Sequence, residues 1–143
     1  MKKISILIVD DDSEDRYLLT SDLEDTGLEL DIHERPDGEA ALQFFLEYEK
    51  NRQEHEDLYP PLIVFLDINM PRMNGMAFLA AFAKARDSIS LKPTIFLMLT
   101  SSERESDRRE SLSYPFVGGY FVKGDAPPEV LRTSLTEVVA RAT

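Results

Sequence analysis

Mostly apolar runs recur along the chain and are separated by segments with helical periodicity. Three nearly continuous apolar runs are typical of strands buried on both faces of a sheet: Ile4–Val9, Leu62–Leu66 and Thr94–Leu99. Leu28–Glu34 and Gly118–Val122 are shorter or more polar, and we interpret them as two further strands. The pattern therefore predicts five strands spread over the whole chain.

Each predicted strand is followed by a segment that we expect to be helical. Side chains that can cap a helix, or prolines that suit its first turn, begin four of these segments: Ser13, Asp37, Asn74 and Pro127–Pro128. The first helix is expected to run to about Thr26, before Gly27, and the second could continue through Glu47–Asp57. Ser102–Leu112 is predicted as a very polar fourth helix.

A strand–helix unit repeated five times predicts an α/β fold. Strands that are joined through helices run parallel, with right-handed crossovers and helices on both faces of the sheet. The length of 143 residues suits one domain, so we expect residues 1–143 to form a single domain. The phenylalanines are interpreted as core residues: Phe44, Phe45, Phe65, Phe78, Phe82 and Phe96.

The composition argues against several classes of function. The chain has no cysteine, which excludes disulfides, thiolate metal sites and a cysteine nucleophile. A net charge of −11 argues against direct nucleic-acid binding, because a phosphate backbone would repel it. No apolar run approaches the ~20 residues of a membrane span. We therefore expect a cytoplasmic protein, and we interpret His33 and His55 as surface residues without nearby ligand partners.

Four of the predicted strands end in polar residues whose chemistry is complementary. Asp10 and Asp11 follow the first strand, Asp67 follows the third, Thr100 the fourth, and Lys123 ends the fifth. In an open parallel sheet, ligands bind where the carboxyl ends of the strands meet, so these side chains are expected to gather at one edge.

Clustered carboxylates need a cation. Two of them about 4 Å apart repel by roughly 4 kcal/mol at an effective dielectric constant near 20. Hard oxygen ligands without histidine or cysteine favour Mg²⁺, which also accepts a phosphate oxygen. A carboxylate can attack phosphorus, and phosphoryl transfer needs charge neutralisation and positioning above all. In isolation each residue could be a helix cap, a turn residue or a solvated charge; the combination favours a phosphoryl-transfer site.

The motifs resemble those of the receiver domains of bacterial two-component systems, over essentially the whole chain. Ile6-Leu7-Ile8-Val9-Asp10-Asp11 is similar to the family's first strand with its acidic pair. The most specific match is the segment similar to the phosphoacceptor motif, Leu66-Asp67-Ile68-Asn69-Met70-Pro71-Arg72-Met73-Asn74-Gly75. Leu99-Thr100-Ser101 resembles the hydroxyl site, and Gly119-Tyr120-Phe121-Val122-Lys123 resembles the last strand.

The resemblance implies a doubly wound, flavodoxin-like (βα)5 fold with strand order 2-1-3-4-5 and no output domain. It implies that Asp67 accepts a phosphoryl group from a sensor histidine kinase or a histidine phosphotransfer protein. Mg²⁺, for which Mn²⁺ can substitute, would be held by Asp10, Asp11, Asp67 and the Asn69 main-chain carbonyl. Thr100 and Lys123 would contact the phosphoryl group, and Tyr120 would turn inward as Thr100 moves.

The resemblance also bears on turnover and partners. It implies a switch rather than an enzyme, with only self-phosphorylation from phosphodonors and slow autodephosphorylation. The downstream protein is unknown, and the chain would be a monomer or a weak dimer through the face formed by the fourth helix and the fifth strand.

Two departures from the family pattern leave alternatives open. Gly124 stands where the family usually has proline, which predicts a looser loop, and Glu47–Asp57 resembles an extension in small regulators linked to bacterial phytochrome kinases. A pseudo-receiver that binds without accepting phosphate is one alternative. Another is a haloacid-dehalogenase-type phosphatase, in which Asp10 of Asp10-x-Asp12 would be the nucleophile.

Overall fold

Strands and helices alternate as predicted in the computed structural model, which describes residues 4–47, 63–86 and 94–142. The strands are β1 (Ile4–Val9), β2 (Leu30–Arg35), β3 (Ile63–Leu66), β4 (Ile95–Thr100) and β5 (Val117–Val122). The helices are α1 (Ser13–Glu24), α2 (Gly38–Leu46), α4 (Gly75–Ala85), α5 (Glu105–Leu112) and α6 (Pro128–Ala142).

The five strands form one sheet in the order β2-β1-β3-β4-β5, and every neighbouring pair is parallel. This order confirms the predicted doubly wound α/β fold. The chain passes from β1 to β2 on one side and then returns to place β3 on the other side of β1. The strand order therefore reverses between β1 and β3, which is where ligands bind in sheets of this kind.

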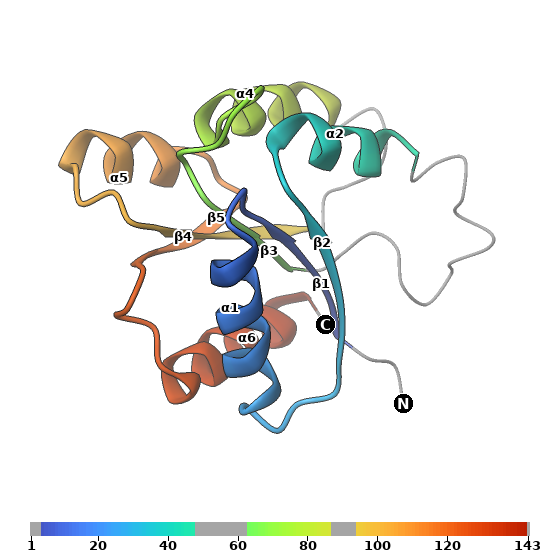
Figure 1. Cartoon of the computed structure of the whole chain (residues 1–143), viewed down its shortest axis with the longest axis vertical. Helices are drawn as coiled ribbons and strands as arrows, with labels where there is room; N and C mark the ends of the chain where they lie inside the picture. The colour runs from blue at the N-terminus through green and yellow to red at the C-terminus, as the bar shows by residue number, and fades with distance from the viewer. Residues whose placement is uncertain (1–3, 48–62, 87–93, 143) are drawn as a thin grey trace.

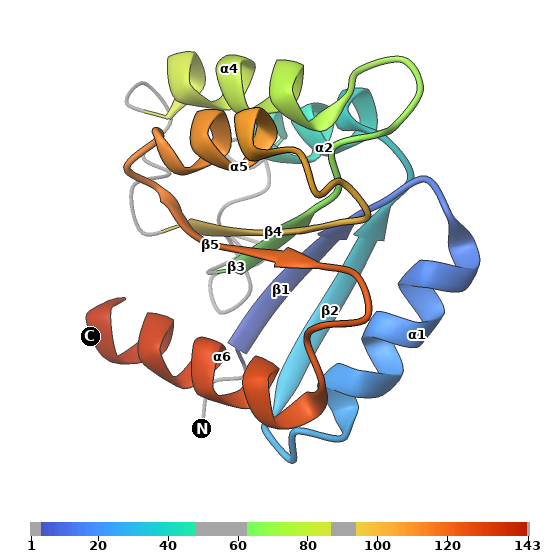
Figure 2. The same ribbon diagram turned by 90° about the vertical axis from the view of Figure 1, so that its left-hand side faces the viewer.

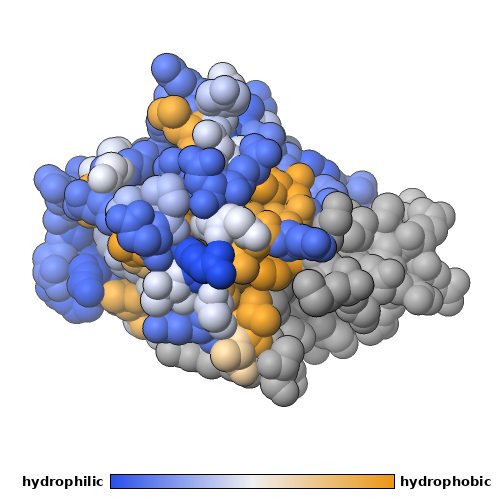
Figure 3. All heavy atoms as spheres, turned by 90° about the horizontal axis from the view of Figure 1, so that it is seen from below, coloured by the Kyte–Doolittle hydropathy of each residue, from blue (hydrophilic) through white to orange (hydrophobic). Residues whose placement is uncertain are grey.

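Helices cover both faces of the sheet, as Figures 1 and 2 show. α2, α4 and α5 lie on one face, and α1 and α6 lie on the other (Figure 2). Because both faces are covered, β1 and β3 can be apolar along nearly their whole length, and every residue of β3 is buried. Figure 3, which views the molecule from the side of α1 and α6, shows a largely hydrophilic surface with a band of hydrophobic residues through its middle.

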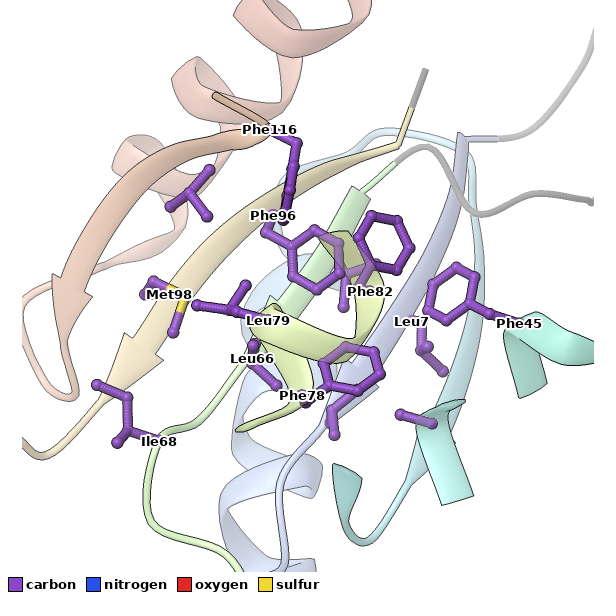
Figure 4. Packing of buried hydrophobic residues seen from close by; sticks show 14 of the residues in the cluster. Leu7, Phe45, Leu66, Ile68, Phe78, Leu79, Phe82, Phe96, Met98 and Phe116 are labelled. Atoms are coloured by element: carbon purple, nitrogen blue, oxygen red, sulfur yellow. The ribbon is translucent and has the colours of Figure 1, made fainter. Parts of the chain in front are cut away.

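Phenylalanines fill the layer between the sheet and helices α2 and α4 (Figure 4). Phe82 of α4 is fully buried, with its ring centroid 4.7 Å from Phe96, 5.1 Å from Phe45 and 5.1 Å from Phe116, all in edge-on arrangements. Such edge-to-face pairs contribute about 0.5–1.5 kcal/mol each beyond the area they bury. The predicted core set is confirmed, since all six phenylalanines are at most 4% exposed.

A second apolar cluster joins the sheet to α1 and α6. Leu19 and Leu23 of α1 and Leu131 and Leu135 of α6 belong to it and are buried. The cluster holds α1 and Ala126, in the loop after β5, against the same side of the sheet.

The helix caps agree with the sequence analysis at two positions and differ at a third. Asp37 and Asn74 are N-caps whose side chains accept from the main-chain N–H groups of Ala40 and Ala77, as predicted. The first helix is capped by Asp12 rather than by Ser13, because the Asp12 carboxylate accepts from the N–H groups of both Glu14 and Asp15.

Several predicted boundaries shift by a few residues. α5 begins at Glu105 instead of Ser102, and Ser102 lies in the loop before it. α2 ends at Leu46, with Glu47 as its C-cap, so the suggested continuation does not begin at Glu47; residues 48–57, including His55, lie outside the described part. Among the helices that the structure describes, none has the length and apolar character needed to cross a membrane.

Candidate phosphoryl-transfer site

The carboxyl ends of β1 and β3 bring Asp10 and Asp67 together. Val9 and Leu66 are register partners on these adjacent strands, and each acidic residue is the next one along its chain. The main-chain N–H of Asp67 donates to the Val9 carbonyl over 3.0 Å, which extends the pairing to the site itself. Sequence reasoning placed these residues at one edge, and the parallel register is the reason they meet there.

Asp10, Asp11 and Asp67 form a cluster of oxygen ligands. Each can offer one carboxylate oxygen, and these oxygens lie within 4.8 Å of one another. Asp10 and Asp67 are buried, at 6% and 4% exposure, whereas Asp11 is exposed. Buried carboxylates at this spacing repel by several kcal/mol, of the order of the roughly 4 kcal/mol expected about 4 Å apart. The donor set, without imidazole or thiolate, fits a hard divalent cation.

Lys123 reaches into the same cluster from the end of β5. Its Nζ lies 2.8 Å from Asp10 Oδ2, 3.2 Å from Asp67 Oδ2 and 2.7 Å from Asp15 Oδ2. The main-chain N–H of Lys123 donates to the Thr100 carbonyl over 2.8 Å, which fixes the start of the side chain. One ammonium group therefore faces three carboxylates.

Burial and these neighbours shift two pKa values. Burial raises the pKa of Asp10 above its usual value, although hydrogen bonds from Lys123 and from the Asp12 N–H oppose the change. For Lys123, burial acts to lower the pKa, but hydrogen bonds to Asp10 and Asp15 and the charge of Asp67 outweigh it and raise the pKa above its usual value. Lys123 is therefore fully protonated at neutral pH.

Local hydrogen bonds hold Asp67 in one orientation. Its Oδ1 accepts from the Ile68 main-chain N–H over 2.7 Å, while Oδ2 faces Lys123. Gly75 closes the loop between β3 and α4, because its N–H donates to the Ile68 carbonyl over 2.8 Å. A Cβ at Gly75 would lie only 2.3 Å from the Asp67 carbonyl oxygen, so this approach requires glycine.

Thr100 and Tyr120 lie in neighbouring strands beside the site. Thr100 is fully buried, and its hydroxyl accepts from the Ser102 main-chain N–H over 3.3 Å. The half-buried Tyr120 donates its hydroxyl to the Ser102 carbonyl over 2.9 Å. The Ser102 hydroxyl in turn donates to Asp107 over 2.5 Å. These bonds join the ends of β4 and β5 to the first turn of α5.

Asn69 is exposed in the loop after β3, two residues beyond Asp67, and the role of its main-chain carbonyl as a metal ligand stays a prediction. His33 belongs to no cluster of potential metal ligands among the described residues, but it is half-buried and has a side-chain partner. Its Nε2 lies 2.8 Å from Asp31 Oδ2, and its ring packs 5.8 Å from that of Phe44.

Sequence reasoning missed Asp15, which makes the shortest contact with Lys123. Asp15 lies in the first turn of α1, where an acidic residue is expected simply to favour the positive end of the helix dipole. Its position three residues after the cap Asp12 was visible in the sequence, but its distance from Lys123, 108 residues away, was not.

The comparison with protein families separates the receiver interpretation from the phosphatase interpretation. Residues 6–133 match the family model described as "Response regulator receiver domain". The chain belongs to this family. Receiver domains are phosphorylation-dependent switches of two-component signalling systems, with an aspartate that accepts the phosphoryl group. Asp12, which would be the second aspartate of a phosphatase motif, is the N-cap of α1.

Similar proteins carry the same assignment. A probable chemotaxis protein CheY from Rhizobium etli is 34% identical over 100 residues, which are 70% of this chain and 66% of that protein. The probable transcriptional regulator ycf27 from Porphyridium aerugineum is 31% identical over 91% of this chain, which spans only 46% of that protein. The receiver domain therefore matches about half to two thirds of these relatives.

Solved structures agree on the fold. A two-component response regulator from Cytophaga hutchinsonii superposes with a TM-score of 0.81 at 25% identity, covering 98% of this chain and 99% of the other. The chemotaxis protein CheY4 from Vibrio cholerae superposes with a TM-score of 0.68 at 27% identity, covering 95% and 98%. The predicted flavodoxin-like arrangement, with strand order 2-1-3-4-5, is confirmed.

Proposed function

We propose that Asp67 is the phosphoacceptor of this receiver and that Asp10, Asp11, Asp67 and the Asn69 main-chain carbonyl hold one Mg²⁺. The observation that carries the proposal is the position of Asp67, which is buried at 4% exposure among the acidic cluster with Lys123 at 3.2 Å. The response regulator Rcp1, 24% identical, is known in a Mn²⁺-bound form, which supports a divalent metal here and Mn²⁺ as a substitute.

Transfer follows from the chemistry of these groups. A carboxylate oxygen of Asp67 forms a bond to phosphorus while the bond from phosphorus to the donor's leaving atom breaks, and the leaving group departs with that electron pair and takes up a proton. The metal, when bound, neutralises charge on the phosphoryl oxygens. Lys123 supplies a second positive charge, and the Thr100 hydroxyl donates a hydrogen bond to a phosphoryl oxygen.

The same groups link phosphorylation to the outer surface. Thr100 and Tyr120 both bond to Ser102, so a movement of Thr100 toward a phosphoryl group would change the loop that leads into α5. A phosphoryl group adds charge and acceptors at one point and thereby shifts a two-state element. We propose that the altered surface lies over α5 and β5, where a downstream protein or a second copy in a weak dimer would bind.

The phosphodonor in this proposal is a sensor histidine kinase or a histidine phosphotransfer protein. Small phosphodonors should also work, because the site itself supplies the charge neutralisation, and loss of the phosphoryl group should be slow self-hydrolysis. The chain would then have no other turnover.

Intact-mass spectrometry after incubation with acetyl phosphate tests this function. We expect one phosphoryl adduct on the wild type with Mg²⁺, none with EDTA, and none on Asp67→Asn. Asp10→Asn serves as a second variant: an adduct that persists in Asp67→Asn and disappears in Asp10→Asn would contradict the proposal and indicate the phosphatase interpretation. No adduct on the wild type would indicate a pseudo-receiver.

A further inference from the structure

One of the carboxylates that contact Lys123 lies outside the candidate metal site. Two of the three carboxylate partners of Lys123, Asp10 and Asp67, belong to the candidate metal cluster. The third and shortest contact is with Asp15 Oδ2 at 2.7 Å, and Asp15 is outside that cluster. An ammonium group has three protons to donate, so all three contacts can exist at once in the metal-free protein.

Lys123 and a divalent cation would compete for the carboxylates of Asp10 and Asp67. A metal held by Asp10 and Asp67 would neutralise part of their negative charge, so the attraction between these carboxylates and Lys123 would weaken. An ammonium group without any other partner would then either displace the metal or swing out toward solvent. Asp15 offers the ammonium group another carboxylate to bind, since Asp15 lies beside the cluster on α1 and its side chain is only 35% exposed.

We propose that Asp15 is a positioning residue that keeps the Lys123 ammonium beside Asp67 while Mg²⁺ occupies the oxygens of Asp10 and Asp67. This inference rests on the proposed function and adds a residue to it.

The backbone on both sides suits this role. Asp15 lies in the first turn of α1, which the Asp12 cap anchors directly after the strand that carries Asp10. Lys123 is fixed by its main-chain hydrogen bond to Thr100. The starts of both side chains are therefore held in place by the backbone, and the two side chains meet with Lys123 Nζ 2.7 Å from Asp15 Oδ2.

A double-mutant cycle on Mg²⁺ affinity tests the proposed positioning role of Asp15 without using phosphorylation. The dissociation constant for Mg²⁺ is measured by titration calorimetry for the wild type, Asp15→Asn, Lys123→Met and the double variant. Without Asp15, Lys123 pairs only with Asp10 and Asp67 and competes more strongly with the metal. We expect Asp15→Asn to weaken Mg²⁺ binding about three- to tenfold when Lys123 is present and less than about twofold in the Lys123→Met background.

The chain provides a matched control for charge. Asp22 lines the same cavity of about 290 Å³ as Asp15 and Lys123, and it lies about two helical turns further along α1. Asp22→Asn removes the same charge without a contact to Lys123, so its effect should stay below about twofold. Asp15→Glu keeps the charge on a longer side chain and should restore most of the affinity. Thermal unfolding of each variant checks that it is folded.

If Asp15→Asn reduces Mg²⁺ affinity equally with Lys123 present and in the Lys123→Met background, the positioning role of Asp15 is overturned. A purely long-range charge effect does not depend on Lys123. Equal effects of Asp15→Asn and Asp22→Asn would overturn the positioning role as well. These results are distinct from failure of the proposed function, which appears as a wild type that gains no phosphoryl group from acetyl phosphate.

Discussion

Lys123 lies among carboxylates whose combined charge it only partly neutralises. Its single ammonium contacts Asp10, Asp15 and Asp67, and Asp11 adds a further negative charge at the rim of the cluster. The remaining negative charge is concentrated at buried groups, where it destabilises the folded protein unless a cation binds. The same negative charge therefore lowers the stability of the metal-free protein and favours the binding of a cation.

Replacing Asp10 should make this loss of stability measurable. Its pKa is raised in the folded protein, so the folded state holds the proton more tightly than the unfolded chain does. Its contribution to stability is therefore fully present below the unfolded value of 3.8 and is lost as the pH rises through the folded pKa. At neutral pH in EDTA, we expect Asp10→Asn to raise Tm by a few degrees, at about 2–4 °C per kcal/mol for this size.

Thermal unfolding at several pH values checks this prediction. The difference in Tm between Asp10→Asn and the wild type should grow as the pH rises above the unfolded value of 3.8, since only the wild type loses stability on ionisation. Asp22→Asn is the control, because it removes a charge outside the cluster. A lower Tm for Asp10→Asn at neutral pH would mean that its pairing with Lys123 outweighs its desolvation.

At the scale of elements, the turn after β5 explains the glycine that departs from the family pattern. Gly124 has φ +95°, and the turn is closed by a hydrogen bond of 2.9 Å from the Asp125 N–H to the Val122 carbonyl. Proline fixes φ near about −65°, so it cannot adopt this conformation. The sequence predicted a looser loop here; instead, the described turn is hydrogen-bonded and places Lys123 in the cluster.

Gly124→Pro should therefore destabilise the protein although it restores the residue that the family usually has. We expect a loss of about 2–4 kcal/mol in the free energy of unfolding, together with weaker phosphorylation, because the turn that positions Lys123 must change. Denaturant unfolding measures the loss.

Gly124→Ala is the matched control. A Cβ at this position meets nothing within 4 Å, so only the strain of positive φ remains, and about 1–2 kcal/mol is expected. If Gly124→Pro were as stable as the wild type, the turn would have a second conformation of similar energy.

The elements differ in how well the sequence predicts them. β1 and β3 were predicted closely because they are buried on both faces and therefore apolar throughout. The start of α5 was placed three residues early, since Ser102 looks like a helix cap. In the structure the Ser102 hydroxyl donates to Asp107, and its carbonyl accepts from Tyr120, so its hydrogen-bonding groups serve the loop. Such tertiary contacts leave no periodic signal.

At the scale of the whole molecule, the doubly wound topology makes the site. It gathers Asp10, Asp67, Thr100 and Lys123 from four strands at one edge, and this gathering was predictable because it depends only on parallel order. Asp15 was not predictable in the same way, because its contact depends on how α1 packs against the end of β5. The topology thus determines which strand ends meet, and packing determines the remaining partners.

Metal binding should stabilise the whole domain, because the cluster exists only in the folded chain. At a tenfold excess of Mg²⁺ over its dissociation constant, the free energy of unfolding should rise by about 1.4 kcal/mol. Thermal unfolding with increasing Mg²⁺ should show a rising Tm for the wild type and little change for Asp10→Asn or Asp67→Asn. Equal shifts in all three would mean that the ion acts elsewhere.

Direct identification of the phosphorylated residue tests the central claim. After incubation with acetyl phosphate and Mg²⁺, borohydride reduces an aspartyl phosphate to homoserine, and peptide mass spectrometry then locates the change. We expect homoserine at position 67, absent without the phosphodonor or with EDTA. Homoserine at position 10 or at another aspartate, with position 67 unchanged, would contradict the assignment of Asp67 as the phosphoacceptor.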